Sequence, residues 1–321
     1  MADTPLIQTE HLQKHFTLRG SFGSKKLVRA VDDVTLSIRR GETFGLIGES
    51  GSGKSTLGRT ITRLYEPTGG RILFQGRDTA LFTGEEMSRY KRSMQIVFQD
   101  PYSSLNPAMN VMQLVAEPLD LTEKLPREAR RQRVVSMLEA VGLDADVLEK
   151  YPHEFSGGQL QRVAIARALI VSPEFILCDE PISALDVSIG AQVINLLQDL
   201  QASMGLTTLF VAHDLSMVRH ISHRIGVMYL GRLVEAAPAA RLYEHPLHPY
   251  SQALLSAIPI ADPRRARHKQ HVPLRGDPPS PMAFLPGCAF ASRCPIARPR
   301  CQSQRPELRE IGESQVACWE A

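Results

Sequence analysis

Short apolar runs and segments with helical character alternate along most of the chain. The apolar runs predict β-strands, and they lie at 6–12, 28–38, 42–47, 71–74, 95–98, 175–178, 207–212, 224–229 and 232–236. The segments between them predict helices at about 56–64, 160–170, 188–203 and 214–220. Because strands that alternate with helices form buried, mostly parallel sheets, the pattern predicts an α/β fold.

Two stretches depart from this alternation. Between about Val111 and Tyr151, charged residues mix with apolar residues at helical spacing, which predicts a helical insert in the α/β core. Beyond residue 260, Pro, Arg and His become frequent and the periodicity is lost. We therefore expect a first domain over residues 1–259, with a helical subdomain at about 100–158, and an irregular extension over 260–321.

The composition excludes several classes of protein. The 321 residues are 43% hydrophobic and 22% charged, which is typical of a globular protein with a sizeable core. The net charge of +3 is too small to indicate nucleic-acid binding, and no Lys/Arg block with interleaved aromatic residues occurs. No apolar run approaches the roughly 18 residues of a membrane span, and residues 1–5 do not begin a signal peptide. We expect a cytoplasmic protein, which leaves docking on a membrane protein open.

One stretch fits the phosphate-binding motif G-x-x-x-x-G-K-[ST]. It follows the apolar run 42–47 and precedes the predicted helix at 56–64, which is the context that the motif requires. Its glycines let backbone N–H groups converge on an anion, and the helix N-terminus adds its dipole. We expect Lys54 to contact the β- and γ-phosphates and Ser55 to bind Mg²⁺. The stretch comprises Gly48, Glu49, Ser50, Gly51, Ser52, Gly53, Lys54, Ser55 and Thr56.

A pair of carboxylates follows a later apolar run. Asp179 and Glu180 come directly after residues 175–178. In an open parallel sheet this position faces the crevice at the carboxyl ends of the strands, where ligands bind. We expect Asp179 to hold Mg²⁺ together with Ser55, and Glu180 to orient or deprotonate the attacking water. A strand end often carries solvated acidic residues, so the pair alone is weak evidence for a site. Together with the phosphate loop it indicates a nucleotide site.

With the segment Phe155-Ser156-Gly157-Gly158-Gln159 these motifs resemble the ATP-binding cassette (ABC) family, from residue 6 to about 250. The family's signature is usually Leu-Ser-Gly-Gly-Gln, so only the first residue departs. Ser156, Gly157, Gly158 and Gln159 would present a hydroxyl and N–H groups to an anion at a helix N-terminus. In the family this signature segment faces the γ-phosphate of ATP held by a second subunit. The resemblance implies a P-loop NTPase core with an antiparallel β subdomain, working as a dimer with two ATP molecules between the subunits.

The resemblance also implies roles for single residues. Gln99, after the apolar run 95–98, would touch Mg²⁺ and the water, and His213 would contact the γ-phosphate and support Glu180. Phe16 aligns with the aromatic residue that stacks on adenine, although Phe22 could serve instead. The loop that crosses the dimer seam is matched by Ser183, Ala184, Leu185 and Asp186.

Further resemblance indicates what ATP hydrolysis drives. Soluble relatives usually carry two cassettes or a long coiled-coil insert, whereas this chain has one cassette and a short insert. The segments that resemble ATPases of dipeptide and oligopeptide importers, most closely the second ATPase of a dipeptide permease, are 98–107, 151–155, 183–188, 228–232, 248–255 and 276–295. This implies a heterodimer with a homologous ABC ATPase, two transmembrane permease subunits and a solute-binding protein, with the chain at the cytoplasmic face of the membrane. Import of nickel or glutathione, or a soluble ABC ATPase outside transport, are the alternatives.

Four of the five cysteines lie in the C-terminal extension. Cys288, Cys294, Cys301 and Cys318 have the spacing C-x5-C-x6-C-x16-C, which differs from that of a common zinc ribbon. A cysteine cluster in a cytosolic chain favours metal binding over disulfides, and four thiolates can hold a [4Fe–4S] cluster. We expect an iron–sulfur cluster, which the resembled family carries here in some members, with Zn²⁺ or free thiols as alternatives. Cys178, inside an apolar run, is expected to be an inert core residue.

Overall fold

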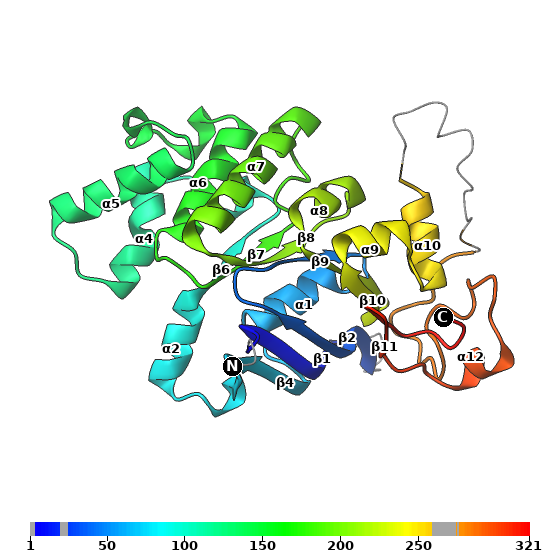
Figure 1. The fold of residues 1–321 in the computed structure, drawn as a ribbon. Helices are drawn as coiled ribbons and strands as arrows, with labels where there is room; N and C mark the ends of the chain where they lie inside the picture. The colour runs from blue at the N-terminus through cyan, green and yellow to red at the C-terminus, as the bar shows by residue number, and fades with distance from the viewer. Residues whose placement is uncertain (1–3, 20–24, 259–273, 275) are drawn as a thin grey trace.

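The computed structural model describes residues 4–19, 25–258, 274 and 276–321 (Figure 1). Within these residues the chain forms two β-sheets with helices packed around them. The larger sheet has the strand order β11-β12-β10-β9-β3-β8-β7-β6, and the smaller sheet has the order β2-β1-β4-β5. The predicted α/β fold is therefore confirmed, and it is built on two sheets of different character.

The central strands of the larger sheet are parallel. They are β6 (Met94–Val97), β7 (Phe175–Asp179), β8 (Thr207–Val211), β3 (Thr43–Ile47) and β9 (Arg224–Tyr229). Every residue of β3, β7 and β8 is buried, because helices cover both faces of a parallel sheet. In Figure 1, α6, α7 and α8 lie on one side of these strands and α1 lies on the other. All five parallel strands end at the same edge of the sheet, which is where the predicted site residues follow them.

The smaller sheet is antiparallel throughout. Its strands are β1 (Ile7–Arg19), β2 (Lys25–Ile38), β4 (Gly69–Phe74) and β5 (Arg77–Asp78). Register shifts along β1 let this long strand bend while it stays paired with β2. One face of the sheet joins a buried apolar cluster with β3 and α1, so the two sheets share a core.

The predicted helices and the helical insert are confirmed. The core helices are α1 (Lys54–Ile61), α6 (Gly157–Leu169), α7 (Val187–Met204) and α8 (Leu215–Ile221). The insert contains α4 (Val111–Thr122), α5 (Arg127–Ala140), η3 (Ala145–Val147) and η4 (Pro152–Glu154). Elements without a sequence prediction are η2 (Thr79–Leu81), α2 (Gly84–Ser93), α9 (Ala239–Glu244) and α10 (Pro249–Ser256), and α3 (Pro101–Ser104) lies in a segment expected to be loop.

The C-terminal extension is more regular than its composition suggests. Its described part contains α12 (Pro299–Ser303) and a hairpin of β11 (Arg309–Ile311) and β12 (Ser314–Val316). β12 pairs with β10 (Arg232–Pro238), so the hairpin completes the edge of the larger sheet. Backbone pairing with an existing edge orders residues 309–316, which lack apolar periodicity, while most of the other described residues of the extension have no regular structure. The expected domain boundary at 259/260 lies outside the described residues and stays a prediction.

Candidate nucleotide site

The predicted phosphate loop lies between the end of β3 and the start of α1. Gly48 and Gly53 have φ values of 153° and 102°, a region that favours glycine. A Cβ atom at Gly48 would lie 2.2 Å from the carbonyl oxygen of Met228, and one at Gly53 would lie 2.0 Å from that of Ala30. The loop backbone is thus pressed against β9 and β2, and no larger residue fits at either position.

Lys54, the first residue of α1, is 5% exposed. Its Nζ donates hydrogen bonds to the carbonyl oxygens of Gly48 at 2.8 Å and Glu49 at 3.1 Å. Burial lowers the pKa of Lys54, and the carboxylates of Glu180 and Asp179 oppose that shift. The ammonium group is therefore held by carbonyl oxygens inside the loop and within the electrostatic reach of both carboxylates.

Asp179 ends β7 with a side chain that is 2% exposed. Its Oδ2 accepts hydrogen bonds from Nη2 and Nε of Arg59 at 2.8 and 3.1 Å. Its Oδ1 is buried and has no hydrogen-bond partner within the described part of the chain. A buried carboxylate oxygen with an open coordination position is a suitable ligand for a hard cation. The donor set of Asp179 and the Ser55 hydroxyl, on the first turn of α1, therefore fits Mg²⁺.

Glu180 has a strained backbone and a histidine partner. Its φ of 53° is in the left-handed region, which a residue with a side chain occupies only at a cost. The backbone is fixed there, because Glu180 N–H donates to the Val211 carbonyl at 2.9 Å and Ser183 Oγ donates to the Glu180 carbonyl at 3.0 Å. His213 Nδ1 lies 3.3 Å from Glu180 Oε2, with the His213 side chain 63% exposed. The predicted pairing of Glu180 with His213 is present in this geometry.

The signature segment forms the N-terminus of α6. Ser156 Oγ accepts a hydrogen bond from Gln159 N–H at 3.4 Å, and Gln159 Oε1 accepts one from Ser156 N–H at 3.2 Å. This capping box occupies the polar groups of an exposed helix start. A Cβ at Gly157 would lie 3.3 Å from a methyl group of Leu185. The signature segment and the predicted seam loop therefore lie against each other on the surface.

The remaining predicted ATP contacts differ in their surroundings. Phe16 is half-buried and packs edge-on against Tyr65 at 5.5 Å between ring centroids. Lys14 Nζ lies 5.0 Å from the Phe16 ring centroid. Gln99 is exposed in the bend that follows β6. Phe22 lies outside the described residues, so the choice between Phe16 and Phe22 stays open.

The predicted metal site of the four cysteines is not supported. In the part of the chain that the structure describes, no group of three or more His, Cys, Asp or Glu side chains has an arrangement that could hold a metal ion. Burial is the main cause that raises the pKa of the Cys288 thiol to about 11, and it also raises the pKa values of Cys294 and Cys318. Cys288, Cys294, Cys301 and Cys318 form no disulfide in this structure, and the expected [4Fe–4S] or Zn²⁺ site stays a prediction.

Three residues make contacts beside the phosphate loop that no sequence motif predicted. Arg59, on α1, binds Asp179 across 120 positions of sequence. Arg293, in the extension, binds Glu49 across 244 positions, and Tyr250 binds Glu49 across 201 positions. These contacts join residues that are distant in sequence, so a local sequence pattern cannot predict them.

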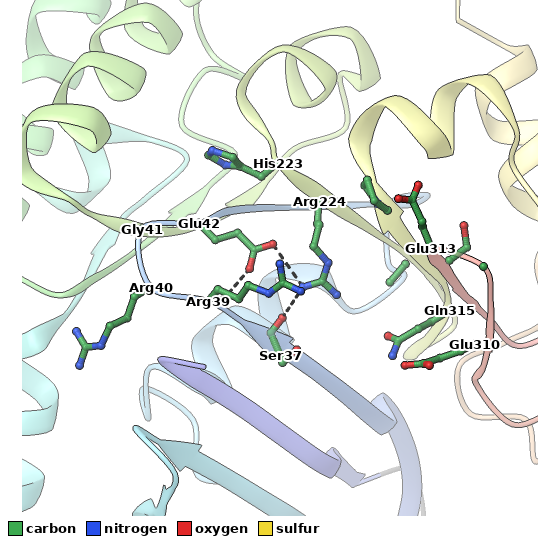
Figure 2. Close-up of a pocket in the computed structure, with 14 residues that line it drawn as sticks. Ser37, Arg39, Arg40, Gly41, Glu42, His223, Arg224, Glu310, Glu313 and Gln315 are labelled. Carbon is green, nitrogen blue, oxygen red and sulfur yellow. Dashed lines mark hydrogen bonds and ion pairs between the residues drawn. The ribbon is translucent and has the colours of Figure 1, made fainter. Parts of the chain in front are cut away.

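A charged cavity lies at the opposite edge of the larger sheet. Its volume is about 760 Å³, and Figure 2 shows Arg39, Glu42 and Arg224 among its lining residues. Glu42 and Arg224 stand at the amino ends of β3 and β9, whereas the phosphate loop follows the carboxyl end of β3. Arg224 donates to Glu42 at 3.4 Å. This charged cavity is therefore separate from the candidate nucleotide site.

Two family models match the chain. One, described as "ABC transporter", matches residues 31–183. The other, described as "Oligopeptide/dipeptide transporter, C-terminal region", matches residues 234–301. The first match contains the phosphate loop, the signature segment and the carboxylate pair. The second contains α10 and the first part of the extension.

Similar proteins cover nearly the whole chain. YkfD of Bacillus subtilis is 52% identical over 320 residues, which are 99% of this chain and 96% of that protein. The oligopeptide transport ATP-binding protein AppF of the same organism is 47% identical over 317 residues, covering 98% of this chain and 96% of AppF.

Solved structures share the fold of the cassette. CbiO1 from Clostridium perfringens, part of the ABC transporter complex cbiONQ, has a TM-score of 0.65 and 29% identity over 75% of this chain and 92% of its own. The dimeric ATP-binding cassette MJ0796, bound to ADP and phosphate, has a TM-score of 0.64 and 31% identity over 73% of this chain and 98% of its own. This chain belongs to the ABC transporter family, as an ATPase subunit with the oligopeptide/dipeptide transporter C-terminal region.

Proposed function

We propose that this ABC ATPase energises the import of dipeptides or oligopeptides across a membrane. The observation that carries the proposal is the match over nearly the full length to AppF, whose name describes oligopeptide transport. This match includes the C-terminal region, which lies beyond the residues that the general ABC transporter model matches. A cassette alone indicates ATP hydrolysis and not the process that it drives. Among the described residues no helix is both long and apolar enough to span a bilayer, so the proposal requires separate permease subunits.

We assign the hydrolytic roles to the residues that surround the phosphate loop. Lys54 would exchange its two carbonyl partners for the β- and γ-phosphate oxygens of ATP. Ser55 and Asp179 would hold Mg²⁺, which when bound supplies positive charge to the phosphates. Glu180 would accept the proton of the attacking water, and His213, 3.3 Å away, would hold that carboxylate in place and contact the γ-phosphate. Gln99 would link this site to the helical insert.

We propose that hydrolysis occurs in a dimer with a homologous ATPase subunit. The signature residues Ser156, Gly157, Gly158 and Gln159 would contact the γ-phosphate of ATP on the partner subunit. The exposure of Ser156 at the N-terminus of α6 supports this role. The seam loop would lie between the two sites, and Ser183 already connects it to Glu180 through a hydrogen bond.

A groove between α2 and α4 supports docking on a permease subunit. It has a volume of about 660 Å³ and is lined by apolar Met87 and Leu121 and by basic Lys91 and Arg167. Leu121 is 82% exposed, and an exposed leucine beside a groove is typical of an interaction surface. We propose a cytoplasmic helix of the permease as the occupant. This would place the chain at the cytoplasmic face of the membrane, held there by its partners.

Uptake of labelled peptides tests the cargo. A strain that lacks this gene should lose uptake of dipeptides or oligopeptides, and the wild-type chain should restore it while the Glu180→Gln variant does not. Loss of nickel or glutathione uptake with unchanged peptide uptake would favour those cargoes. Unchanged uptake of all three would favour a soluble ABC ATPase outside transport.

A resident [4Fe–4S] cluster or Zn²⁺ ion stays a prediction of the cysteine spacing alone. Iron, sulfide and zinc contents of the chain purified without oxygen test it directly. A cluster predicts a brown protein with stoichiometric iron and sulfide, and zinc predicts a colourless one. The absence of all three from the freshly purified complex would leave free thiols as the correct interpretation.

A further inference from the structure

The C-terminal extension reaches back to the phosphate loop. Nη1 of Arg293 lies 3.0 and 3.2 Å from the two carboxylate oxygens of Glu49, the second residue of the loop. The Arg293 side chain is only 6% exposed, and that of Glu49 is 27% exposed. One nitrogen of a buried guanidinium thus contacts both carboxylate oxygens, which is a charge-assisted contact. The extension therefore touches the nucleotide site through a specific ion pair.

An aromatic cluster holds Arg293 against the core. Phe290, in the extension, is 1% exposed and packs edge-on against Tyr229 at 5.3 Å between ring centroids. Arg293 donates a hydrogen bond to the Tyr229 hydroxyl at 3.4 Å. Tyr250 lies 4.7 Å from Tyr229 between centroids, and its hydroxyl accepts a hydrogen bond from Glu49 N–H at 2.9 Å. The cluster thus fixes the backbone of Glu49 through Tyr250 and its side chain through Arg293.

The charge of Glu49 gives this contact a consequence for nucleotide binding. The loop must accept a triphosphate, and a carboxylate within it repels that anion. The carbonyl of Glu49 is also one of the two that hold Lys54. An arginine that binds the Glu49 carboxylate neutralises its charge and keeps it turned toward the extension.

We propose that Arg293 is a positioning residue for ATP binding, which acts by neutralising Glu49 and fixing its orientation in the phosphate loop. The inference rests on the proposed assignment of the nucleotide site and adds the extension to that site. It makes the C-terminal region a determinant of ATP affinity, although this region lies outside the matched cassette.

Titration of the purified full-length chain with a non-hydrolysable ATP analogue and Mg²⁺ tests the proposal. Arg293→Met should weaken binding by about tenfold, the effect of one unpaired charge near the phosphates in a partly screened site. Adding Glu49→Gln to Arg293→Met should restore most of that affinity, because the repelling charge is gone. In the assembled ATPase, Arg293→Met should raise KM for ATP more than it lowers kcat.

Arg305→Met is the matched control, because Arg305 also joins the extension to the core. It pairs with Asp32 at 3.3 Å and with Asp33 at 3.2 Å on β2, instead of the phosphate loop. This variant should keep the ATP affinity of the wild type. Equal weakening by both arginine variants, an Arg293→Met variant with wild-type affinity, or a double variant as weak as Arg293→Met would each overturn the proposal. A wild-type chain that binds no nucleotide would instead overturn the assignment of the phosphate loop.

Discussion

The phosphate loop and the signature segment are both glycine-containing helix N-termini, but their surroundings differ. The first turn of α1 has no side-chain cap, and it begins with a buried lysine. Tyr250 and Arg293 bind the loop from outside. The first turn of α6 has a complete capping box of its own, and Ser156 and Gln159 are exposed.

This difference suits the two helix N-termini to different roles in anion binding, with the phosphate loop the more complete site of the two. The phosphate loop holds the buried ammonium group of Lys54, and Tyr250 and Arg293 fix the loop through contacts with Glu49. The loop therefore has the positive charge that a triphosphate requires without help from another chain. In the signature segment, Ser156 and Gln159 hydrogen-bond to each other in the capping box. The segment 156–159 contains no lysine or arginine. Under the proposed function its ligand would be presented by another chain, and the similar cassette MJ0796 is dimeric in its solved structure.

The largest expected effect concerns ATP turnover at the phosphate loop. Glu180→Gln removes the carboxylate that would accept the proton of water, so ATP turnover should fall by about a thousandfold. ATP binding should remain, because the phosphate contacts are untouched. Steady-state hydrolysis by the assembled complex, compared with analogue binding, measures the two separately. Turnover within threefold of the wild type would remove Glu180 from the mechanism.

The next effect concerns affinity at the same site. Lys54→Ala should weaken ATP binding to the isolated chain by about a hundredfold, because a buried charge-assisted contact to phosphate is lost. Equilibrium titration of the purified variant measures the loss, and its thermal unfolding serves as the folding control. Unchanged affinity in a folded variant would mean that the nucleotide lies elsewhere.

A smaller effect should appear at the signature segment, and only in the dimer. Ser156→Ala removes a hydroxyl, so turnover of the complex should fall by about tenfold, while the ATP affinity of the isolated chain changes little. Thr83→Ala is a matched control, because Thr83 forms the same kind of capping box at α2. Each variant should lose about 1 kcal/mol of stability, but only Ser156→Ala should lose turnover. Equal turnover losses would reduce the signature segment to an ordinary helix cap.

A last effect concerns the pH dependence of folding stability near Tyr250, which binds the phosphate loop. His248 is buried and accepts a hydrogen bond from Tyr250 N–H through Nδ1, which requires the unprotonated ring. Burial lowers its pKa from 6.5 to about 3. Between these values the unfolded chain binds a proton that the folded chain excludes, so stability falls as pH falls below 6.5, at up to roughly 1.4 kcal/mol per pH unit.

Urea unfolding at pH 7 and pH 5 measures this loss. His248→Asn keeps a residue that can cap α10 but removes the titrating ring, so its stability should fall less over the same interval. An equal fall in the variant and the wild type would assign the pH dependence to other groups.

Local patterns predicted most of the core and singled out candidate residues for the site. β3, β7 and β8 are buried at every position, so their apolar runs stood out. Lys54, Asp179 and Glu180 could be singled out because the phosphate-loop motif and an apolar run place them where parallel strands end. His213 was named only through the resemblance to the ABC family.

Long-range contacts could not be predicted in this way. The hairpin of β11 and β12 is ordered by pairing with β10, and nothing in its own residues indicates that edge. The contact between Arg293 and Glu49 joins residues 244 positions apart. α2 had a local signal that the prediction missed, since Thr83 and Glu86 form a capping box before a polar helix.

Photolabelling of the assembled ATPase pair tests the central claim most directly. This chain would carry Lys54→Ala, which weakens binding at its own loop, and its homologous partner would bind an ATP analogue with a photoreactive γ-phosphate, at a concentration that leaves the variant loop mostly unoccupied. The account predicts that label attaches to residues 156–159 of this chain and that peptide mapping finds it there. Label confined to the partner subunit would contradict a shared site and leave the signature segment without a role in ATP binding.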